Sequence, residues 1–369
     1  METETVLAWL HVGDLHITEA GQDNHRDLHR IADAFRRLPQ DAADFMLLPG
    51  DNADDGMEAQ FALVRKALAG LAMTVHILPG DHDFKPGSLD AFNRVLGAEA
   101  LPKAATVRGY RCLFLDVVSA GSGGPDFRLD AGQLEWLERE VDEAERACEP
   151  VAVFMHTYPA DLRAGAEPLR ALLDRPHVFC VDMGHTHYNE LANDGSTIFM
   201  ATRSTGQIEE GPVGFSMAAV DAGGVSWRFK PLNSAWPFVL ITRPVDRRLA
   251  TERNAPAPAA PVRALVVGDA PIESVEVRWD DGSSAPMRPE RARPHLWTAP
   301  PDAVGQGRVS VRARDALGRH DTDAVEPCFT RWLPPARTRD GSDRDRTGPW
   351  PEKGVVGSQL GPNRNGRKW

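Results

Sequence analysis

The chain has 369 residues, more than one ordinary compact domain holds, so two domains are the starting expectation. Its residues are 42% hydrophobic and 26% charged, as is typical of a globular protein, and its formal net charge is −11. This charge argues against nonspecific binding to nucleic acid or to an anionic membrane, because the overall field repels phosphate. A local cationic centre, such as a metal cluster, could still attract an anion.

The N-terminus reads METETVLAWLHVGD and has no basic region before its short apolar run, so we do not expect a signal peptide. No segment approaches the roughly 18 apolar residues that a membrane span needs. The cysteines are scattered, without a CxxC motif or a close pair, which favours reduced thiols: Cys112, Cys148, Cys180 and Cys328. These features predict a cytoplasmic protein that does not span a membrane.

Up to about residue 230, short apolar runs alternate with longer amphipathic ones. The runs typical of strands are Val6–Val12, Phe45–Leu48, Thr74–Leu78, Val151–Met155 and Val178–Met183. The runs with helical periodicity are His25–Leu38, Met57–Leu71, Leu89–Leu96 and Gln133–Cys148. This alternation predicts α/β layers with helices over a central sheet. Strands also follow one another directly near Cys112–Val117 and Tyr188–Lys230, which indicates a mixed sheet or a sheet doubled into a sandwich.

The second part of the chain has a different texture. Residues 250–261 read ATERNAPAPAAP, which predicts an extended or loosely ordered linker. Short alternating segments with turn signals follow, and together with PFVLITRP before the linker they accommodate about seven strands. An immunoglobulin-like β-sandwich at 236–330 is the economical interpretation, with Trp279 and Trp297 as core anchors. This domain could mediate homo-oligomer formation, restrict access to the metal site or bind a partner.

The final segment, 331–369, is polar, basic and rich in Gly, Pro and Arg. It nevertheless contains three tryptophans, Trp332, Trp350 and Trp369, which a disordered tail would rarely keep. We therefore expect at least part of it to dock on a folded domain. The chain then divides into a domain at 1–235, the small all-β domain at 236–330 and this tail.

Polar side chains of metal-ligand type follow nearly every strand of the first domain. They are Asp14 and His16; Asp51 and Asn52; Asp81, His82 and Asp83; His156; and His185 and His187. Because functional groups gather at the carboxyl ends of strands in open α/β sheets, five such strand ends are expected to converge on one site. Each of these motifs, taken alone, has an ordinary structural explanation. The hypothesis of a metal site depends on the occurrence of all of them in this order along the chain.

Mixed carboxylate and imidazole donors suit Mn, Fe, Zn or Co better than Ca or Mg. Seven ligands exceed the need of a single zinc ion, which takes three or four. They suffice for two ions if one carboxylate bridges them. Two ions about 3.5–4 Å apart form a standard clamp for in-line phosphoryl displacement.

The ordered set DLH, GDN, GDHD, MH and GHTH resembles the motif series of the calcineurin-like metallophosphoesterase superfamily, over about residues 5–230. The segment GDNADDG is similar to the form found in its class III cyclic nucleotide phosphodiesterase branch. The resemblance implies a four-layer β-sandwich flanked by helices. Purple acid phosphatases have a ligating tyrosine three residues after the bridging Asp; here that position is Asp54, so no tyrosine–iron bond is expected.

The resemblance also implies roles for the motif residues. The first metal ion would be held by Asp14, His16 and His187, the second by Asp81, His156 and His185, and Asp51 would bridge both. A water or hydroxide shared by the two ions would be the nucleophile. His82 would contact the phosphoryl oxygen and stabilise or protonate the leaving group, and Asp83 would orient His82. Asn52 is a further candidate phosphate contact.

One position departs from the family pattern, because Asp81 stands where the family usually has Asn. Its added negative charge should repel a dianionic monoester more than a monoanionic diester. The leading hypothesis is therefore a metal-dependent phosphoesterase acting on a small phosphodiester, with a cyclic nucleotide as one candidate. The alternatives are a phosphomonoesterase or nucleotide pyrophosphatase of the same superfamily, and a non-catalytic binding scaffold. Nucleic acid is not expected as a substrate, given the acidic composition. The tail is a candidate lid over the metal site, although a solvated terminus is the preferred interpretation.

Overall fold

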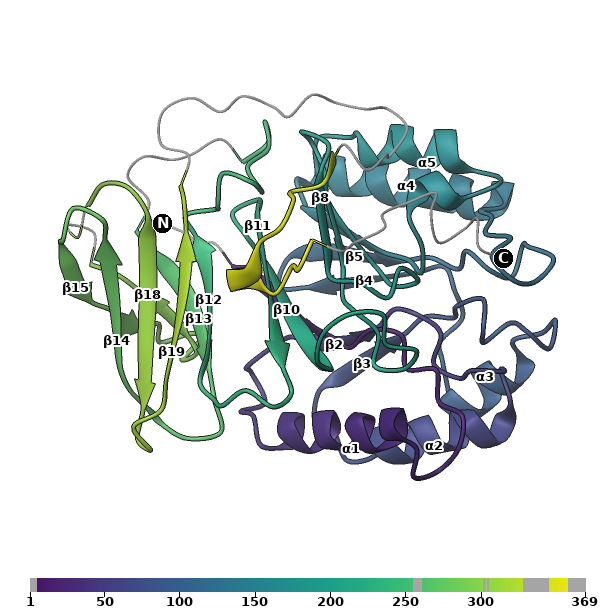
Figure 1. Ribbon diagram of the computed structural model, residues 1–369. Coiled ribbons are helices and arrows are strands. Elements are labelled where there is room, and N and C mark those ends of the chain that lie inside the picture. Colours follow the sequence, from purple (N-terminus) through teal and green to yellow (C-terminus); the bar gives the residue numbers. More distant parts are fainter. Residues whose placement is uncertain (1–4, 255–260, 301–302, 304, 328–344, 358–369) are drawn as a thin grey trace.

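The computed structural model describes residues 5–254, 261–300, 303, 305–327 and 345–357. A five-stranded sheet has the order β11-β10-β1-β2-β3 (Figure 1). Its strands are β1 Val6–His11, β2 Phe45–Leu48, β3 Thr74–Ile77, β10 Gly214–Asp221 and β11 Gly224–Pro231. The first three are parallel, and the β10–β11 hairpin runs antiparallel beside β1. The carboxyl ends of β1, β2 and β3 therefore meet at one edge.

A six-stranded sheet has the order β4-β5-β6-β7-β9-β8. Its strands are β4 Lys103–Val107, β5 Tyr110–Phe114, β6 Val151–Phe154, β7 Val178–Met183, β8 Glu190–Asn193 and β9 Ile198–Ala201. The four inner strands are parallel, and β4 and β8 are antiparallel edge strands.

The two sheets pack face to face, with helices on their outer faces. Along β1, Leu7 and Trp9 point into the core between the sheets, whereas Ala8 and Leu10 pack with the helices. The first sheet is covered by α1 Asp23–Arg36 and α2 Glu58–Leu68, with α3 Asp90–Leu96 packed on α2. The second is covered by α4 Ala131–Ala147 and α5 Ala166–Leu173. A short 3₁₀ turn, η1 Pro159–Asp161, comes before α5 in the chain. These layers form the mixed α/β fold that the alternation of strands and helices predicts.

The predicted strands and helices of this region occur within two or three residues of their expected ends. Helix α5 was not predicted, and its sequence AEPLRALL shows why. Pro168 reads as a helix breaker, yet a proline in the first turn removes no intrahelical hydrogen bond, because the first amides have no partner there. The edge strand β4 was not predicted either, since KAATV lacks a strong apolar alternation.

The C-terminal strands form two four-stranded sheets, in the orders β12-β13-β17-β16 and β15-β14-β18-β19. Their bounds are β12 Phe238–Arg243, β13 Arg263–Val267, β14 Ile272–Trp279, β15 Ser284–Pro286, β16 Arg288–Pro289, β17 Leu296–Thr298, β18 Val309–Asp315 and β19 His320–Val325. Both sheets contribute to one apolar core, in which Trp279 is buried and Trp297 is half-buried. The expectation that these tryptophans anchor the core is confirmed.

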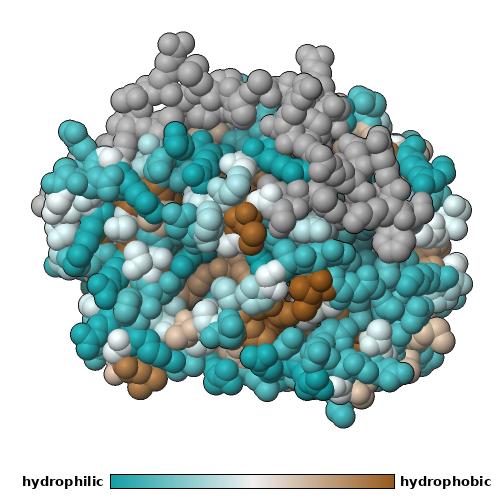
Figure 2. Space-filling view, viewed as in Figure 1, coloured by the Kyte–Doolittle hydropathy of each residue, from teal (hydrophilic) through white to brown (hydrophobic). Residues whose placement is uncertain are grey.

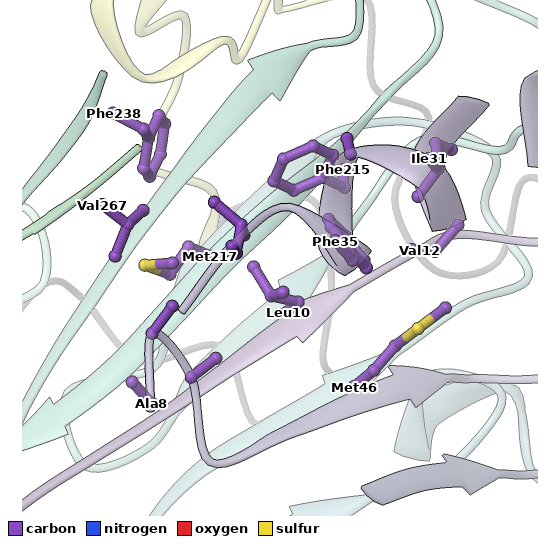
Figure 3. Packing of buried hydrophobic residues seen from close by; sticks show 14 of the residues in the cluster. Ala8, Leu10, Val12, Ile31, Phe35, Met46, Phe215, Met217, Phe238 and Val267 are labelled. Carbon is purple, nitrogen blue, oxygen red and sulfur yellow. The ribbon is translucent and has the colours of Figure 1, made fainter. Parts of the chain in front are cut away.

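The two C-terminal sheets, here called the sandwich, share a second core with the five-stranded sheet (Figure 3). Phe238 of β12 and Val267 of β13 pack in the same cluster as Met217 of β10 and Leu10 of β1. The sandwich is therefore joined to the five-stranded sheet by apolar packing as well as by the chain.

The predicted linker at 250–261 is only partly as expected. Ala250 and Thr251 are buried, and the Asn193 amide donates hydrogen bonds to the carbonyls of Arg248 and Ala250 at 3.0 and 2.8 Å. Arg253 donates to the carbonyls of Val178 and Asp174. The start of this segment is thus packed against the six-stranded sheet. The Ala250 carbonyl accepts from Asn193 at the end of β8, and the Arg253 guanidinium donates to the carbonyl of Val178 at the start of β7. Residues 255–260 lie outside the described part.

Part of the tail docks, as predicted. Residues 345–357, with the 3₁₀ turn η3 Pro351–Lys353, lie between the sandwich and strands β8 and β11, in yellow in Figure 1. Trp350 is 4% exposed and belongs to the core between the two large sheets. Trp332 and Trp369 lie outside the described residues.

The described residues on the face seen in Figure 2 are largely hydrophilic. Among the described residues, the exposed large apolar side chains are Met57, Ile208, Leu317 and Val356. No helix within the described ranges is long and apolar enough to cross a membrane. The cysteines within those ranges, Cys112, Cys148 and Cys180, are free thiols, and Cys328 lies outside.

The shared core predicts that the sandwich and the five-stranded sheet unfold together. Replacing Phe238, which is 3% exposed, by alanine should lower the free energy of unfolding by about 3–5 kcal/mol in a single transition. Urea unfolding followed by tryptophan fluorescence measures this change. Leu317→Ala, at a side chain that is 69% exposed, is the control and should change the free energy by less than about 0.5 kcal/mol. Two separate transitions in the parent protein would contradict the expectation.

Candidate metal centre

All seven residues predicted to bind metal lie in one region, in loops at the carboxyl ends of strands from both large sheets. Asp14 and His16 follow β1, Asp51 follows β2, and Asp81 follows β3, while the imidazoles of the second sheet follow β6 and β7: His156, His185 and His187. Six of the seven side chains are buried and His187 is half-buried. The distances below place these groups beside one another.

Four of them form a compact group whose ligand atoms all lie within 4.8 Å of one another: Asp51, Asp81, His156 and His185. Nε2 of His156 is 3.3 Å from Oδ1 of Asp81 and 3.5 Å from Oδ2 of Asp51. Nδ1 of His185 is 3.5 Å from the same Asp81 oxygen. Nδ1 of His156 lies 3.1 Å from the carbonyl of Pro49 and must carry the proton, because a carbonyl only accepts. Nε2 is thereby left to face the carboxylates.

The remaining predicted ligands, Asp14, His16 and His187, lie close to this group. Nε2 of His16 is 3.7 Å from Oδ2 of Asp51 and 3.0 Å from Nε2 of His187. Oδ1 of Asp14 accepts a hydrogen bond from the backbone N–H of His185 at 3.2 Å. A second compact group, His16, Asp51 and His82, shares Asp51 with the first. Asp51 is therefore common to both groups of potential ligands.

The backbone around these residues is unusual. His16, Asp51, His185 and His187 all have positive φ values between 43° and 66°, a region that non-glycine residues seldom adopt. Such conformations cluster at functional sites, where surrounding contacts enforce them. Gly50 and Gly80 allow the close approach of these groups. A Cβ on Gly50 would lie 2.1 Å from Nδ1 of His156, and a Cβ on Gly80 would lie 2.1 Å from Oδ1 of Asp51. A side chain at either position would push the ligands apart.

Burial and mutual charge shift the pKa values of these groups. Burial opposes ionisation of Asp51 and Asp81, yet neighbouring imidazoles hold the pKa of each carboxyl below its usual range. Burial also opposes the charge on His156, but Asp51, Asp81 and Asp14 raise the pKa of that imidazole well above its usual value. Without cations, the carboxylates are thus compensated by protons on the imidazoles. Divalent ions could take the place of those protons.

One buried atom is consistent with such ions. Within the described part of the chain, Oδ2 of Asp14 is among the buried atoms that have no hydrogen-bond partner. Buried polar atoms are nearly always paired, and an unpaired one calls for an explanation such as a bound ion. The pKa of His187 is lowered to about 3 by burial and by His16, so its imidazole is neutral and able to donate a lone pair. The donor set fits borderline divalent metals.

Asp83 and Asn52 have different partners from those predicted. The Asp83 carboxylate accepts from the backbone N–H groups of Asn52, Ala53 and Gly80 and from the Asn52 amide, at 2.8–3.1 Å. The Asn52 amide also donates to the carbonyl of Leu78 at 2.9 Å. Asn52 is fully buried and its N–H groups have internal acceptors, so it ties the ligand loops together in this structure, and its phosphate contact stays a prediction. Asp83 likewise ties two ligand loops together.

The group facing His82 is Asp54, which the sequence interpretation did not assign to the site. Nδ1 of His82 lies 2.8 Å from the Asp54 carbonyl and 3.3 Å from its carboxylate. The same carboxylate is 3.4 Å from Nδ1 of His16 and accepts from Gln207 at 2.6 Å. His16 is the main reason that the pKa of Asp54 falls to about 2. The available signal is the second Asp of GDNADDG, which belongs to the pattern similar to the class III branch and also occupies the position of the tyrosine in purple acid phosphatases.

Comparison with known proteins agrees with this geometry. Residues 9–189 match the family model described as calcineurin-like phosphoesterase. A probable cyclic nucleotide phosphodiesterase of Synechococcus sp. is 27% identical over 214 residues, which cover 54% of this chain and 80% of that protein. The 3′,5′-cyclic adenosine monophosphate phosphodiesterase CpdA of Escherichia coli is 28% identical over 177 residues, which cover 46% of this chain and 63% of that enzyme.

Among solved structures, a dimetal phosphatase from Danio rerio has a TM-score of 0.52 at 14% identity. The alignment covers 61% of this chain and 96% of that one. At this identity the likeness concerns the fold alone.

Metal uptake should release protons. Because the pKa values of His16, His156 and His185 are raised in the metal-free protein, these imidazoles carry protons near neutral pH and must lose them to coordinate an ion. Affinity for Mn²⁺ should therefore rise with pH between about 6 and 8. Calorimetric titration of chelator-treated protein in two buffers of different ionisation enthalpy should show about one proton released per ion or more. An enthalpy of binding that does not depend on the buffer would contradict this.

Proposed function

Because the chain belongs, through residues 9–189, to the calcineurin-like phosphoesterase family, we propose that it hydrolyses a small phosphodiester at a centre of two divalent metal ions. Membership makes it a metal-dependent phosphoric ester hydrolase, and the finer proposal concerns the two ions and the diester. The observation that carries it is the position of Asp51, whose Oδ2 lies 3.5 Å from Nε2 of His156 and 3.7 Å from Nε2 of His16, one imidazole from each proposed ligand set. One carboxylate shared by two groups of donors is what a pair of adjacent ions requires.

The family resemblance assigns the proposed ligand sets, and the geometry supports them. Asp14, His16 and His187 would hold one ion, and His16 and His187 face each other at 3.0 Å. Asp81, His156 and His185 would hold the other, and they form a compact group with Asp51. When bound, the ions would supply an activated water and neutralise charge on the phosphoryl group. The residues around them keep the imidazole lone pairs pointed inward and exclude bulk water from the cluster.

His82 is the proposed residue for the leaving group. Its backbone N–H donates to Asp51 at 2.9 Å, which holds its loop against the cluster. Its Nδ1 faces two acceptor atoms of Asp54, so Nδ1 carries a proton and Nε2 is the atom that can contact substrate. In the doubly protonated ring, Nε2–H would donate to a phosphoryl or leaving-group oxygen. Asp54 then holds the ring in the required orientation.

Two features favour a diester over a monoester. Asp81 adds a carboxylate beside Asp51 and Asp14, which disfavours the second negative charge of a monoester. The Synechococcus and E. coli relatives bear the names of cyclic nucleotide phosphodiesterases. A cyclic nucleotide is thus the first substrate class to test.

We propose in addition that the chain divides at about residue 235 into a phosphoesterase domain and an immunoglobulin-like sandwich at 236–330. The support is the pair of four-stranded sheets around a core of their own. The sandwich remains the candidate surface for self-association.

The purified protein, treated with chelator and reloaded with Mn²⁺ or Co²⁺, should hydrolyse bis-p-nitrophenyl phosphate and 3′,5′-cyclic AMP faster than p-nitrophenyl phosphate. Asp81→Asn should raise the rate on the monoester relative to the diester by roughly tenfold, because it removes one negative charge beside the phosphoryl group. Asp55→Asn, at a carboxylate that is 57% exposed, is the charge-matched control and should leave the ratio unchanged. An unchanged ratio in Asp81→Asn would refute the electrostatic argument, and metal-loaded protein inactive on all three substrates would refute the proposed function.

His82→Ala should lower kcat by about 10²–10⁴-fold if the imidazole protonates the leaving group. The loss should be larger for methyl phenyl phosphate than for methyl p-nitrophenyl phosphate, because p-nitrophenolate departs without a proton. Steady-state rates on the two diesters measure the difference. His320→Ala, an exposed histidine of the sandwich, is the control. Equal losses on both substrates would assign His82 to charge stabilisation instead of proton transfer.

A further inference from the structure

Residues 345–357, here called the strap, join three parts of the molecule. The strap pairs with the edge strand β8, since the N–H of Thr347 donates to the carbonyl of Leu191 at 2.9 Å and Arg346 bridges to Ala192. It then passes β11 on its way along the sandwich (Figure 1). Trp350 inserts into the core between the large sheets, with the Arg248 guanidinium 4.5 Å from its ring centre.

A buried ion pair fixes the strap to the sandwich. Lys353 is 2% exposed, and its Nζ lies 2.6 and 2.7 Å from the two carboxylate oxygens of Asp323 on β19. Removing one partner of such a pair is costly, so the strap is held in one register. Gly354, at φ 89°, follows directly and lies against Phe229 of β11.

The carbonyl of Gly354 accepts hydrogen bonds from two buried side chains. Nδ2 of Asn189 and Nη2 of Arg203 each lie 2.9 Å from this oxygen. The network closes on itself, because Oδ1 of Asn189 accepts from the N–H of Arg203 at 2.8 Å and Glu210 is 3.3 Å from the Arg203 guanidinium. A shift of the strap would therefore move Asn189 and Arg203 together.

Both side chains adjoin ligands of the same proposed ion. Asn189 is two residues after His187. The carbonyls of Thr202 and Arg203 pack so closely on Gly13, the residue before Asp14, that a Cβ there would be 2.4 Å from each. The N–H of Thr205 also donates to the carbonyl of Asp14 at 3.0 Å. The strap is thus linked to the backbone of His187 through Asn189, and to the backbone of Asp14 through Arg203 and its neighbours.

We propose that the strap is a positioning element for the first metal ion, so that the affinity for this ion depends on the Gly354 carbonyl. The inference rests on the proposed function, because it takes Asp14, His16 and His187 as ligands of one ion. Residues that orient metal ligands typically contribute about 10–100-fold to affinity. Gly354, Asn189 and Arg203 are positioning residues here.

Gly354→Ala tests the proposal in the full-length chain. Its Cβ would lie 2.7 Å from the Cβ of Phe229, so the strap has to move. Calorimetric titration of chelator-treated protein with Co²⁺, together with the visible cobalt spectrum, should show one binding event weakened about 10–100-fold and the other retained. The weakened event should be the one that His187→Ala abolishes.

Gly348→Ala is the matched control. It has a similar φ of 75° in the same segment, but nothing lies within 4 Å of the added carbon. It imposes a similar backbone strain without moving the Gly354 carbonyl, and should bind both ions as the parent does. Equal affinities in Gly354→Ala and the parent, whatever the thermal stabilities, would reduce the strap to a purely structural role and overturn the proposal.

Asn189→Asp decides the question if Gly354→Ala does not fold. It keeps the oxygen that accepts from Arg203 but places an acceptor against the Gly354 carbonyl. The added negative charge alone would tighten cation binding. A weakened first event therefore supports the strap, and an unchanged or tighter one overturns it. Failure of the parent protein to bind two ions would instead count against the proposed function.

Discussion

The structure depends on how three buried carboxylates and the imidazoles around them compensate one another. Asp14, Asp51 and Asp81 lie where burial alone would make each of them neutral. In the absence of metal, neighbouring imidazoles keep the pKa values of Asp51 and Asp81 low, whereas burial and Asp51 leave the pKa of Asp14 raised. Bound divalent ions would compensate all three carboxylates, so the affinity of the cluster for metal is expected to depend on pH.

That balance requires several loops to be held at fixed distances. The two large sheets supply the ends of five strands, and the glycines at positions 50 and 80 let backbone and imidazole approach each other. Positive φ values at four of the proposed ligands show that the loops are not in their relaxed conformations. The packing of the sheets supplies the free energy that maintains this strain.

Much of this could be predicted from sequence, because the signals are local. Val6–His11 and Phe45–Leu48 are apolar runs followed closely by Asp or His. The same short segment therefore predicts a strand, the edge of the sheet where it ends and the metal-binding side chains at that edge. The hydrogen bond between Gln207 and Asp54 could not be predicted in this way. The two residues are 153 positions apart in the sequence, and no local pattern indicates the path of the loop that brings them together. The alternation of the later strands indicated a sandwich, but not that Phe238 would share a core with Met217. Trp350 was a sound indication of docking, whereas the role of Gly354 depends on a carbonyl that every residue possesses.

The core shared by Phe238, Val267 and Met217 also limits how this chain could have been assembled in evolution. A sandwich that met its neighbour through a polar surface could be exchanged between genes as a unit. Here, recombination near residue 235 would leave apolar side chains of β10 uncovered in one product and those of β12 and β13 uncovered in the other. The two parts are therefore expected to have diverged in concert, each substitution on one side of the seam constraining those tolerated on the other.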